Sequence, residues 1–173
     1  MILGAILAGG AARRFGSDKA MARLQGRALI DHVRDALEPW VDRVAVCGRN
    51  DGSPLMLSDR PAPGLGPLGG LAAALHFADA QGFARVLTAP CDTPFIDRRV
   101  FETLVAADGP AFVESCPVIG LWPARLSHLL DDYLAGSEDR AMRAWARHID
   151  ADSLDLPVPI NVNRPADLES LGA

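Results

Sequence analysis

The residues with the clearest chemical potential lie in a glycine-containing loop near the N-terminus. Residues 7–19 read LAGGAARRFGSDK, so two consecutive glycines are followed by Arg14 and Lys19. Adjacent glycines let backbone N–H groups converge on an anion, because no Cβ stands in the way. Since the two cations add positive charge in the same loop, the pattern predicts a cradle for a triphosphate. A surface loop with incidental basic residues is the alternative.

A second candidate is Asp92, which lies in the motif PCDTPF directly after the apolar run 85–89. A carboxylate at this place can bind a hard divalent cation such as Mg²⁺, which prefers oxygen ligands and bridges them to phosphate oxygens. The alternative is a turn-capping role, which Asp before Thr-Pro commonly has. The residue types allow either role.

The motif NVNRP supplies neutral oxygen atoms near the C-terminus. Asn161 and Asn163 are two residues apart, so on an extended segment they point to the same side. Asn163 could give a cation a neutral ligand beside the charged Asp92, or it could cap a helix that begins near Pro165. The two roles are compatible.

A fourth candidate is Asp59, which precedes the glycine-rich stretch PGLGPLGG at residues 63–70. Glycines there permit close backbone approach to a flat ligand, and a helix from Pro67 would direct its N-terminal dipole at an anion. The alternative for Gly69 and Gly70 is that they let this helix pack tightly on a sheet.

Alternating strands and helices must position these motifs. The apolar patterns predict strands over 2–7, 43–47, 55–57, 85–89, 111–113, 118–121 and 158–162, and helices over 29–40, 67–80, 98–106, 125–134, 138–148 and from about 165. This order predicts an α/β fold, with a mostly parallel sheet and helices on both faces. Such sheets bind ligands beyond the carboxyl ends of their strands, so the motifs should meet at one edge.

The composition limits the classes of function. The chain of 173 residues predicts a single domain over 1–173, and its net charge of −5 argues against binding DNA or RNA. The three cysteines form no CxxC pair, the N-terminus is a poor signal peptide, and no apolar stretch is long enough to cross a membrane. We therefore expect a cytoplasmic monomer with reduced thiols. The four histidines all fall in predicted helices, and we assign them no catalysis.

The order and spacing of LAGG, the Arg and Asp-Lys that follow it, GPLGG, PCDTPF and NVNRP resemble the molybdenum cofactor guanylyltransferase family over nearly the whole chain. The resemblance implies a Rossmann-like nucleotidyltransferase domain that transfers GMP from GTP to the terminal phosphate of molybdopterin, with Mg²⁺ as cofactor. The products would be molybdopterin guanine dinucleotide and pyrophosphate. Molybdoenzymes or their chaperones would be transient partners.

The resemblance also implies roles for particular residues. Asp92 would bind magnesium, with Asn163 a further contact near the metal, and Lys19 would bind the phosphates together with Arg14. The GTP nucleotide would be contacted by Leu7, Ala8, Gly9, Gly10 and Asp59. The sequence departs from the family at Cys47-Gly48-Arg49, where an Asn-containing stretch is common, and in the short segment 108–117, where pterin contacts are expected.

Two other functions fit the same motifs. Pterin cytidylyltransferases usually carry Ala-Ala-Gly where this chain has Ala8-Gly9-Gly10, so the sequence favours guanine. A non-catalytic nucleotide- or cofactor-binding adaptor for molybdoenzymes is a function of a different class. The presence of both Lys19 and Asp92 argues against it, because binding alone rarely needs a carboxylate suited to a metal beside the phosphates.

Overall fold

A seven-stranded sheet forms the centre of the molecule. We describe a computed structural model, and the description covers residues 1–9, 19–49, 52–157, 161–162 and 166–167. The strands lie in the order β5 (Met56–Leu57), β4 (Arg43–Cys47), β1 (Ile2–Leu7), β6 (Arg85–Pro90), β8 (Cys116–Pro123), β7 (Ala111–Val113) and β9 (Asp152–Leu154). All neighbouring strands are parallel except β8, which is antiparallel to both β6 and β7.

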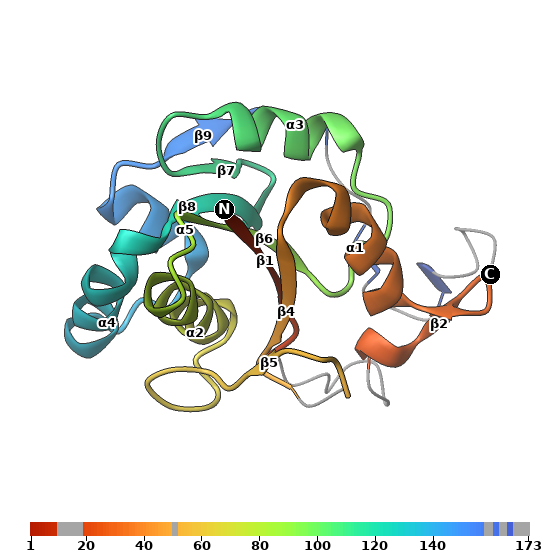
Figure 1. Cartoon of the computed structure of the whole chain (residues 1–173), viewed down its shortest axis with the longest axis horizontal. Helices are drawn as coiled ribbons and strands as arrows, with labels where there is room; N and C mark the ends of the chain where they lie inside the picture. The colour runs from red at the N-terminus through yellow and green to blue at the C-terminus, as the bar shows by residue number, and fades with distance from the viewer. Residues whose placement is uncertain (10–18, 50–51, 158–160, 163–165, 168–173) are drawn as a thin grey trace.

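Helices cover both faces of this sheet (Figure 1). On one face, α1 (Leu29–Leu37) and α3 (Arg98–Ala106) pack against Ile6, Leu87 and their neighbours in one apolar cluster. On the other face lie α2 (Pro67–Ala80), α4 (Ser127–Gly136) and α5 (Met142–His148), which bury the opposite side of the strands. Because β1 has apolar cover on both faces, all six of its residues are buried.

Short 3₁₀ turns connect several of these elements. They are η1 (Lys19–Met21), η2 (Glu38–Trp40) and η3 (Ala124–Leu126). Pro39 lies within η2, so α1 changes to the tighter turn where the sequence predicts that the helix ends. Within the described ranges, no helix is both long and apolar enough to cross a membrane.

Most of the predicted elements are confirmed. β1, β4, α2, α3 and β7 have the predicted bounds, and the mostly parallel sheet with helices on both faces is present. The predicted helix 138–148 begins only at Met142, because side chains before it accept backbone N–H groups: Ser137 from Asp139, and Asp139 from Ala141.

Three parts of the strand prediction are wrong. A hairpin of β2 (Arg23–Leu24) and β3 (Arg27–Ala28) was not predicted, nor was β9. Asn161 and Val162 lie in no strand, although a strand was predicted over 158–162, and residues 158–160 are outside the described ranges.

Candidate active site

The carboxyl ends of β1 and β6 bring two of the predicted motifs together, and the end of β4 lies beside them. In the register of β1 with its neighbours, Leu7 lies opposite Cys47 on one side and opposite Pro90 on the other. The N–H of Ala8 donates to the Cys47 carbonyl at 2.9 Å, and the N–H of Cys91 donates to the Leu7 carbonyl at 3.3 Å. The loops after these strands therefore start side by side, which confirms the predicted edge.

Gly9 and Gly48 are in direct backbone contact at this edge. A Cβ on Gly48 would lie 2.5 Å from the Cα of Gly9, and a Cβ on Gly9 would lie 3.3 Å from the Cα of Gly48. Gly48 also has a φ of +81°, which residues with a side chain rarely adopt. The close approach requires glycine at position 48, and it leaves little room for a side chain at position 9. The sequence motifs assign Gly48 no role, although a glycine directly after a predicted strand is a usable signal.

Asp59 lies against this glycine pair. A Cβ on Gly9 would be 3.1 Å from the Oδ2 of Asp59, and a Cβ on Gly48 would be 2.8 Å from its Oδ1. Gly69 allows the start of α2 to approach Asp59, since a Cβ on Gly69 would be 3.1 Å from the Cβ of Asp59. Glycines from three segments thus surround one carboxylate.

One oxygen of this carboxylate lacks a partner. Oδ1 of Asp59 is buried and has no hydrogen-bond partner in the described part of the chain. Burial raises the pKa of Asp59 above its usual value, and a hydrogen bond from the Gly64 backbone opposes part of this rise. An acceptor held in such surroundings is suited to N–H groups of a ligand.

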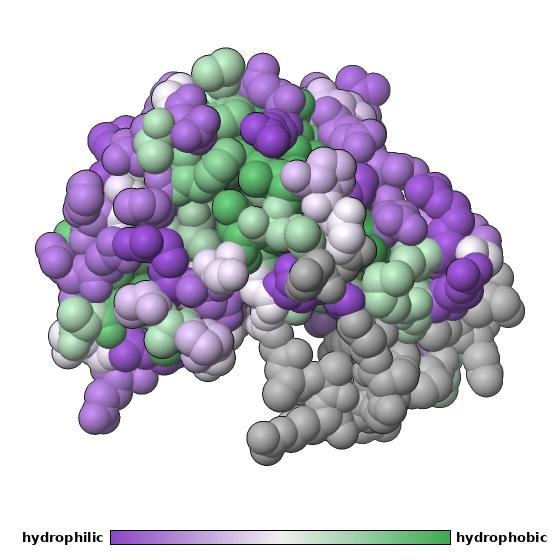
Figure 2. Space-filling view, turned by 60° about the horizontal axis from the view of Figure 1, so that its bottom comes forward, coloured by the Kyte–Doolittle hydropathy of each residue, from purple (hydrophilic) through white to green (hydrophobic). Residues whose placement is uncertain are grey.

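A cavity of about 440 Å³ opens beside Asp59, within the range of small-molecule sites. Its lining comes from the segments after β4 and around β5: Gly48, Arg49, Met56, Leu57, Ser58, Asp59 and Pro63. Figure 2 turns this end of the sheet towards the viewer and shows apolar surface in the middle of the face, bordered by hydrophilic side chains.

Asp92 lies across β1 from this cavity, in the loop after β6. Its side chain is partly buried, and the buried hydroxyl of Thr93 donates to its Oδ1 at 3.4 Å. Its carbonyl accepts the N–H of Val162 at 2.9 Å, which brings the NVNRP segment to the same loop, as the sequence predicts. Thr93 and Val162 are contacts of Asp92 that the sequence did not reveal.

The start of β8 also reaches Asp92. Burial raises the pKa of the Cys116 thiol, hydrogen bonds from the Ile119 and Val118 backbones oppose the rise, and the charge of Asp92 adds to it. The segment 108–117, expected to contact the pterin, therefore includes a turn from β7 to β8 beside the candidate metal ligand. Within the described ranges, no three His, Cys, Asp or Glu residues are grouped to hold a metal without other ligands.

The other predicted site residues are described only in part. Leu7 is buried in the core, and Ala8 and Gly9 are half-buried. Lys19 begins η1, where the next residue, Ala20, is buried in the apolar cluster with α1. Four sites lie outside the description: Gly10, Arg14, Asn163 and the side chain of Lys19. For Gly69 and Gly70, which are both buried, the structure supports the packing alternative.

Known proteins resemble this chain in sequence and in fold. Residues 4–153 match the MobA-like NTP transferase domain family. The molybdenum cofactor guanylyltransferase of Cereibacter sphaeroides is 36% identical, over 96% of this chain and 93% of the relative. That of Sinorhizobium fredii is 35% identical, over 95% of this chain and 87% of the relative.

Solved structures agree on the fold. Molybdopterin-guanine dinucleotide biosynthesis protein A from Archaeoglobus fulgidus has a TM-score of 0.70 at 20% identity, over 99% of this chain and 96% of that one. A 2-C-methyl-D-erythritol 4-phosphate cytidylyltransferase from Thermus thermophilus has a TM-score of 0.69 at 16% identity, with the same coverage. With the sequence match spanning nearly its whole length, the chain belongs to the molybdenum cofactor guanylyltransferase family of MobA-like nucleotidyltransferases.

Proposed function

We propose that this protein transfers GMP from GTP to the terminal phosphate of molybdopterin, with Mg²⁺ as cofactor, releasing pyrophosphate. The family match supports the reaction class. The observation that supports the choice of nucleotide is the buried, unpartnered Oδ1 of Asp59 beside Gly9 and the cavity.

The chemistry of the bases explains why this carboxylate favours guanine. Guanine presents two adjacent donors, N1–H and the N2 amino group, and a carboxylate can accept from both. Cytosine presents the unprotonated N3 and O2 beside a single amino group, so it would place lone pairs against Asp59. A buried acceptor facing acceptors costs more than a missing contact, and Asp59 therefore discriminates against CTP.

Phosphoryl transfer would take place on the other side of β1, where Ala8 and Gly9 lead into the loop to Lys19. An oxygen of the molybdopterin phosphate attacks the α-phosphorus of GTP, and the bond to the β-phosphate breaks as pyrophosphate leaves. A phosphate monoester has a second pKa near about 6, so the nucleophile is already ionised at neutral pH and needs no general base. The protein contributes by holding two anions in line and balancing their charge.

The described residues fit a magnesium ion held mainly by phosphates. Mg²⁺ binds through one or two carboxylates together with substrate phosphates and water, so the single carboxylate of Asp92 is sufficient from the protein. The ion would neutralise charge that develops on the phosphates. Thr93 and the Val162 N–H orient Asp92 from its side chain and its backbone. Lys19 and Arg14 would supply the remaining positive charge.

The decisive test is pyrophosphate release from the purified protein with molybdopterin, molybdate and Mg²⁺, with GTP and CTP compared in parallel. We expect release with GTP alone. The Asp92→Ala variant should still bind GTP yet release no pyrophosphate, whereas Asp132→Ala, which removes an exposed carboxylate on α4, should match the wild type.

Each of the other outcomes contradicts a stated part of the proposal. Release with CTP instead of GTP would make the protein a cytidylyltransferase. No release with either nucleotide, together with intact GTP binding, would support the non-catalytic adaptor.

A further inference from the structure

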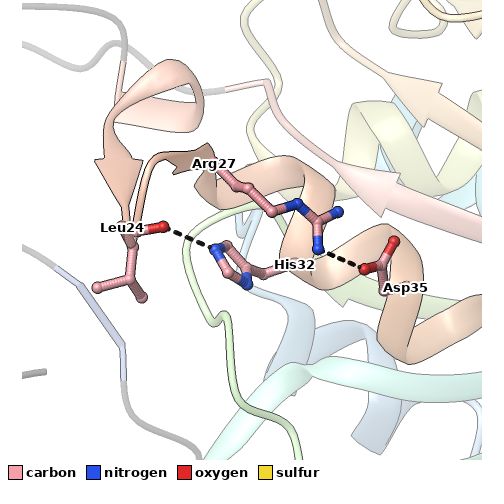
Figure 3. Close-up of polar contacts among 4 residues, drawn as sticks. All are labelled: Leu24, Arg27, His32 and Asp35. Atoms are coloured by element: carbon pink, nitrogen blue, oxygen red, sulfur yellow. Dashed lines mark hydrogen bonds and ion pairs between the residues drawn. The ribbon is translucent and has the colours of Figure 1, made fainter. Parts of the chain in front are cut away.

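His32 lies between two segments that the reaction must hold in register. It is half-buried on α1, the helix that directly follows β3. Its Nε2 donates to the carbonyl oxygen of Leu24 at 3.0 Å, which requires the proton on Nε2 (Figure 3). The other side of its ring meets Phe95 edge-on, with 5.7 Å between the ring centroids. One imidazole therefore contacts both the β2–β3 hairpin and the loop after Asp92.

The hairpin follows closely in the chain on Lys19, the last residue of the glycine loop. Leu24 follows Lys19 by five residues, and the N–H of Leu29 donates to the Ala22 carbonyl at 2.9 Å, which closes the base of the hairpin. Leu24 and Leu29 are fully buried together with Val162. Any movement of the hairpin relative to α1 would thus shift residue 19 at one end and the NVNRP segment at the other.

Phe95 connects the His32 ring to the loop that contains Asp92. It lies three residues after Asp92, 44% of its surface is exposed, and the His32 ring lies edge-on against it. Val162, in the hairpin's apolar cluster, donates its N–H to the Asp92 carbonyl. The Asp92 loop and the hairpin are therefore joined twice: through Val162 and through His32.

A second polar contact between the hairpin and α1 is weaker. A guanidinium nitrogen of Arg27 donates to Oδ2 of Asp35 at 2.7 Å, and it is the ion pair drawn in Figure 3. Both side chains are more than half exposed, at 51% and 54%, so salt screens the pair and it holds the hairpin weakly. The part-buried His32 bond is the better fixed of the two.

We propose that His32 is a positioning residue for nucleotidyl transfer, which holds the end of the glycine loop in register with the Asp92 loop. The inference rests on the proposed function. The cavity beside Asp59 does not include the hairpin, so GTP binding through its base should be independent of His32. Alignment of the phosphates with Asp92 should depend on it. His32 would therefore act on kcat and leave the KM for GTP nearly unchanged.

Two substitutions separate the two contacts of the ring. His32→Phe keeps an aromatic edge for Phe95 but removes the donor to Leu24, whereas His32→Gln keeps an N–H of similar reach and removes the ring. His76→Phe, at an exposed histidine on α2, is the matched control. We expect His32→Phe to lower kcat roughly tenfold, as loss of one hydrogen bond allows, with the KM for GTP within about twofold of wild type. His32→Gln keeps the bond to the hairpin but loses the ring contact with Phe95, so it should also lower kcat, and His76→Phe should match the wild type.

Amide hydrogen exchange tests the same contact without turnover. The amides of residues 23–28 should exchange roughly tenfold faster in His32→Phe, and close to the wild-type rate in His32→Gln. Unchanged exchange in His32→Phe, a wild-type kcat in either His32 variant, or a raised KM with a normal kcat would each overturn the proposal. If the wild type itself gives no product, the proposed function is wrong, and the exchange rates alone decide whether His32 holds the hairpin.

Discussion

Gly48 and Asp59 lie so close together that a Cβ on Gly48 would be 2.8 Å from the Oδ1 of Asp59. The same Cβ would be 2.5 Å from the Cα of Gly9, which is a backbone atom and cannot rotate away. The space that a side chain would need is thus occupied by the nucleotide loop and by the carboxylate proposed to bind guanine. Gly48 therefore contributes close packing at this edge.

Gly48→Ala should therefore cost both stability and GTP affinity. Part of the cost is general, because an alanine with positive φ is strained by about 1 kcal/mol. Gly82→Ala isolates that part: Gly82 has a φ of +76°, and nothing lies within 4 Å of a Cβ there. We expect urea unfolding to show a loss of about 1 kcal/mol for Gly82→Ala and at least about 2 kcal/mol for Gly48→Ala. Calorimetry should show weaker GTP binding for Gly48→Ala alone, and equal losses in the two variants would contradict the close contact.

Gly9→Ala tests nucleotide choice. Its Cβ would be 3.1 Å from Oδ2 and 3.3 Å from Oδ1 of Asp59, so the carboxylate must move by a few tenths of an ångström. Because guanine is proposed to bind both oxygens, we expect kcat/KM for GTP to fall roughly tenfold or more, with a smaller effect on any activity with CTP. Gly136→Ala, at the end of α4, where nothing lies within 4 Å of a Cβ, is the control and should leave both unchanged. A Gly9→Ala enzyme with wild-type preference for GTP would show that Asp59 does not select the base.

The sequence predicted the parts of the fold that depend on local patterns. The bounds of α2 follow from Pro67 at its first turn and a run of small apolar residues, and those of β1 follow from six buried positions in succession. The hairpin was missed because each strand has two residues, and its turn, Gln25-Gly26, carries the positive φ values of a type I′ turn without the usual Asn or Asp. β9 reads Asp-Ser-Leu, which has no apolar pattern, and it is defined only by its pairing with β7.

The sequence predicts at which edge of the sheet the candidate site lies, but it does not predict the contacts between the site residues. The parallel register of β1 with β4 and β6 brings the predicted loops together, as the rule for such sheets requires. The contact of Gly9 with Gly48, the bond from Val162 to Asp92 and the position of His32 each join residues more than thirty positions apart. Nothing in the local sequence encodes these distances, since they depend on how the helices pack on the sheet.

Thr88 offers a test of stability that should leave catalysis intact. Its buried hydroxyl donates to the Val118 carbonyl at 2.7 Å and accepts the indole N–H of Trp122 at 2.9 Å, which joins β6 to β8 in the core. Thr88→Val has nearly the same volume but leaves both partners unsatisfied. We expect a loss of about 2 kcal/mol in urea unfolding and an unchanged kcat well below the melting temperature.

The control for Thr88→Val is Thr103→Val on α3. The hydroxyl of Thr103 donates to the Arg99 carbonyl at 2.8 Å at an exposed position, where water can replace it. Its cost should stay within about 0.5 kcal/mol. If the two variants lose the same stability, the buried pair of hydrogen bonds makes no special contribution.

Asp59 should bind GTP at the expense of stability. Because burial raises the pKa of its carboxyl above the unfolded value, folding favours the protonated form. The ionised Asp59 therefore lowers the free energy of unfolding at neutral pH, and this loss disappears as the pH falls through the raised pKa. GTP binding has the opposite requirement, since only the ionised carboxylate accepts both N–H groups of guanine. Affinity should fall as the pH drops through a value above the usual range for Asp.

Asp59→Asn separates these two effects. The variant cannot ionise at position 59, so at neutral pH it should melt at a higher temperature than the wild type, while its KM for GTP rises roughly tenfold or more. The gain in stability should shrink on acidification, and the acidic loss of GTP affinity should be absent from the variant. The ion pair of Asp35 with Arg27 provides an internal contrast, because the pKa of Asp35 is lowered, chiefly by its hydrogen bond from Arg27. Asp35→Asn should therefore lose stability at neutral pH, and that loss should vanish in acid. If Asp59→Asn behaved in the same way, Asp59 would not be a desolvated, ligand-binding carboxylate.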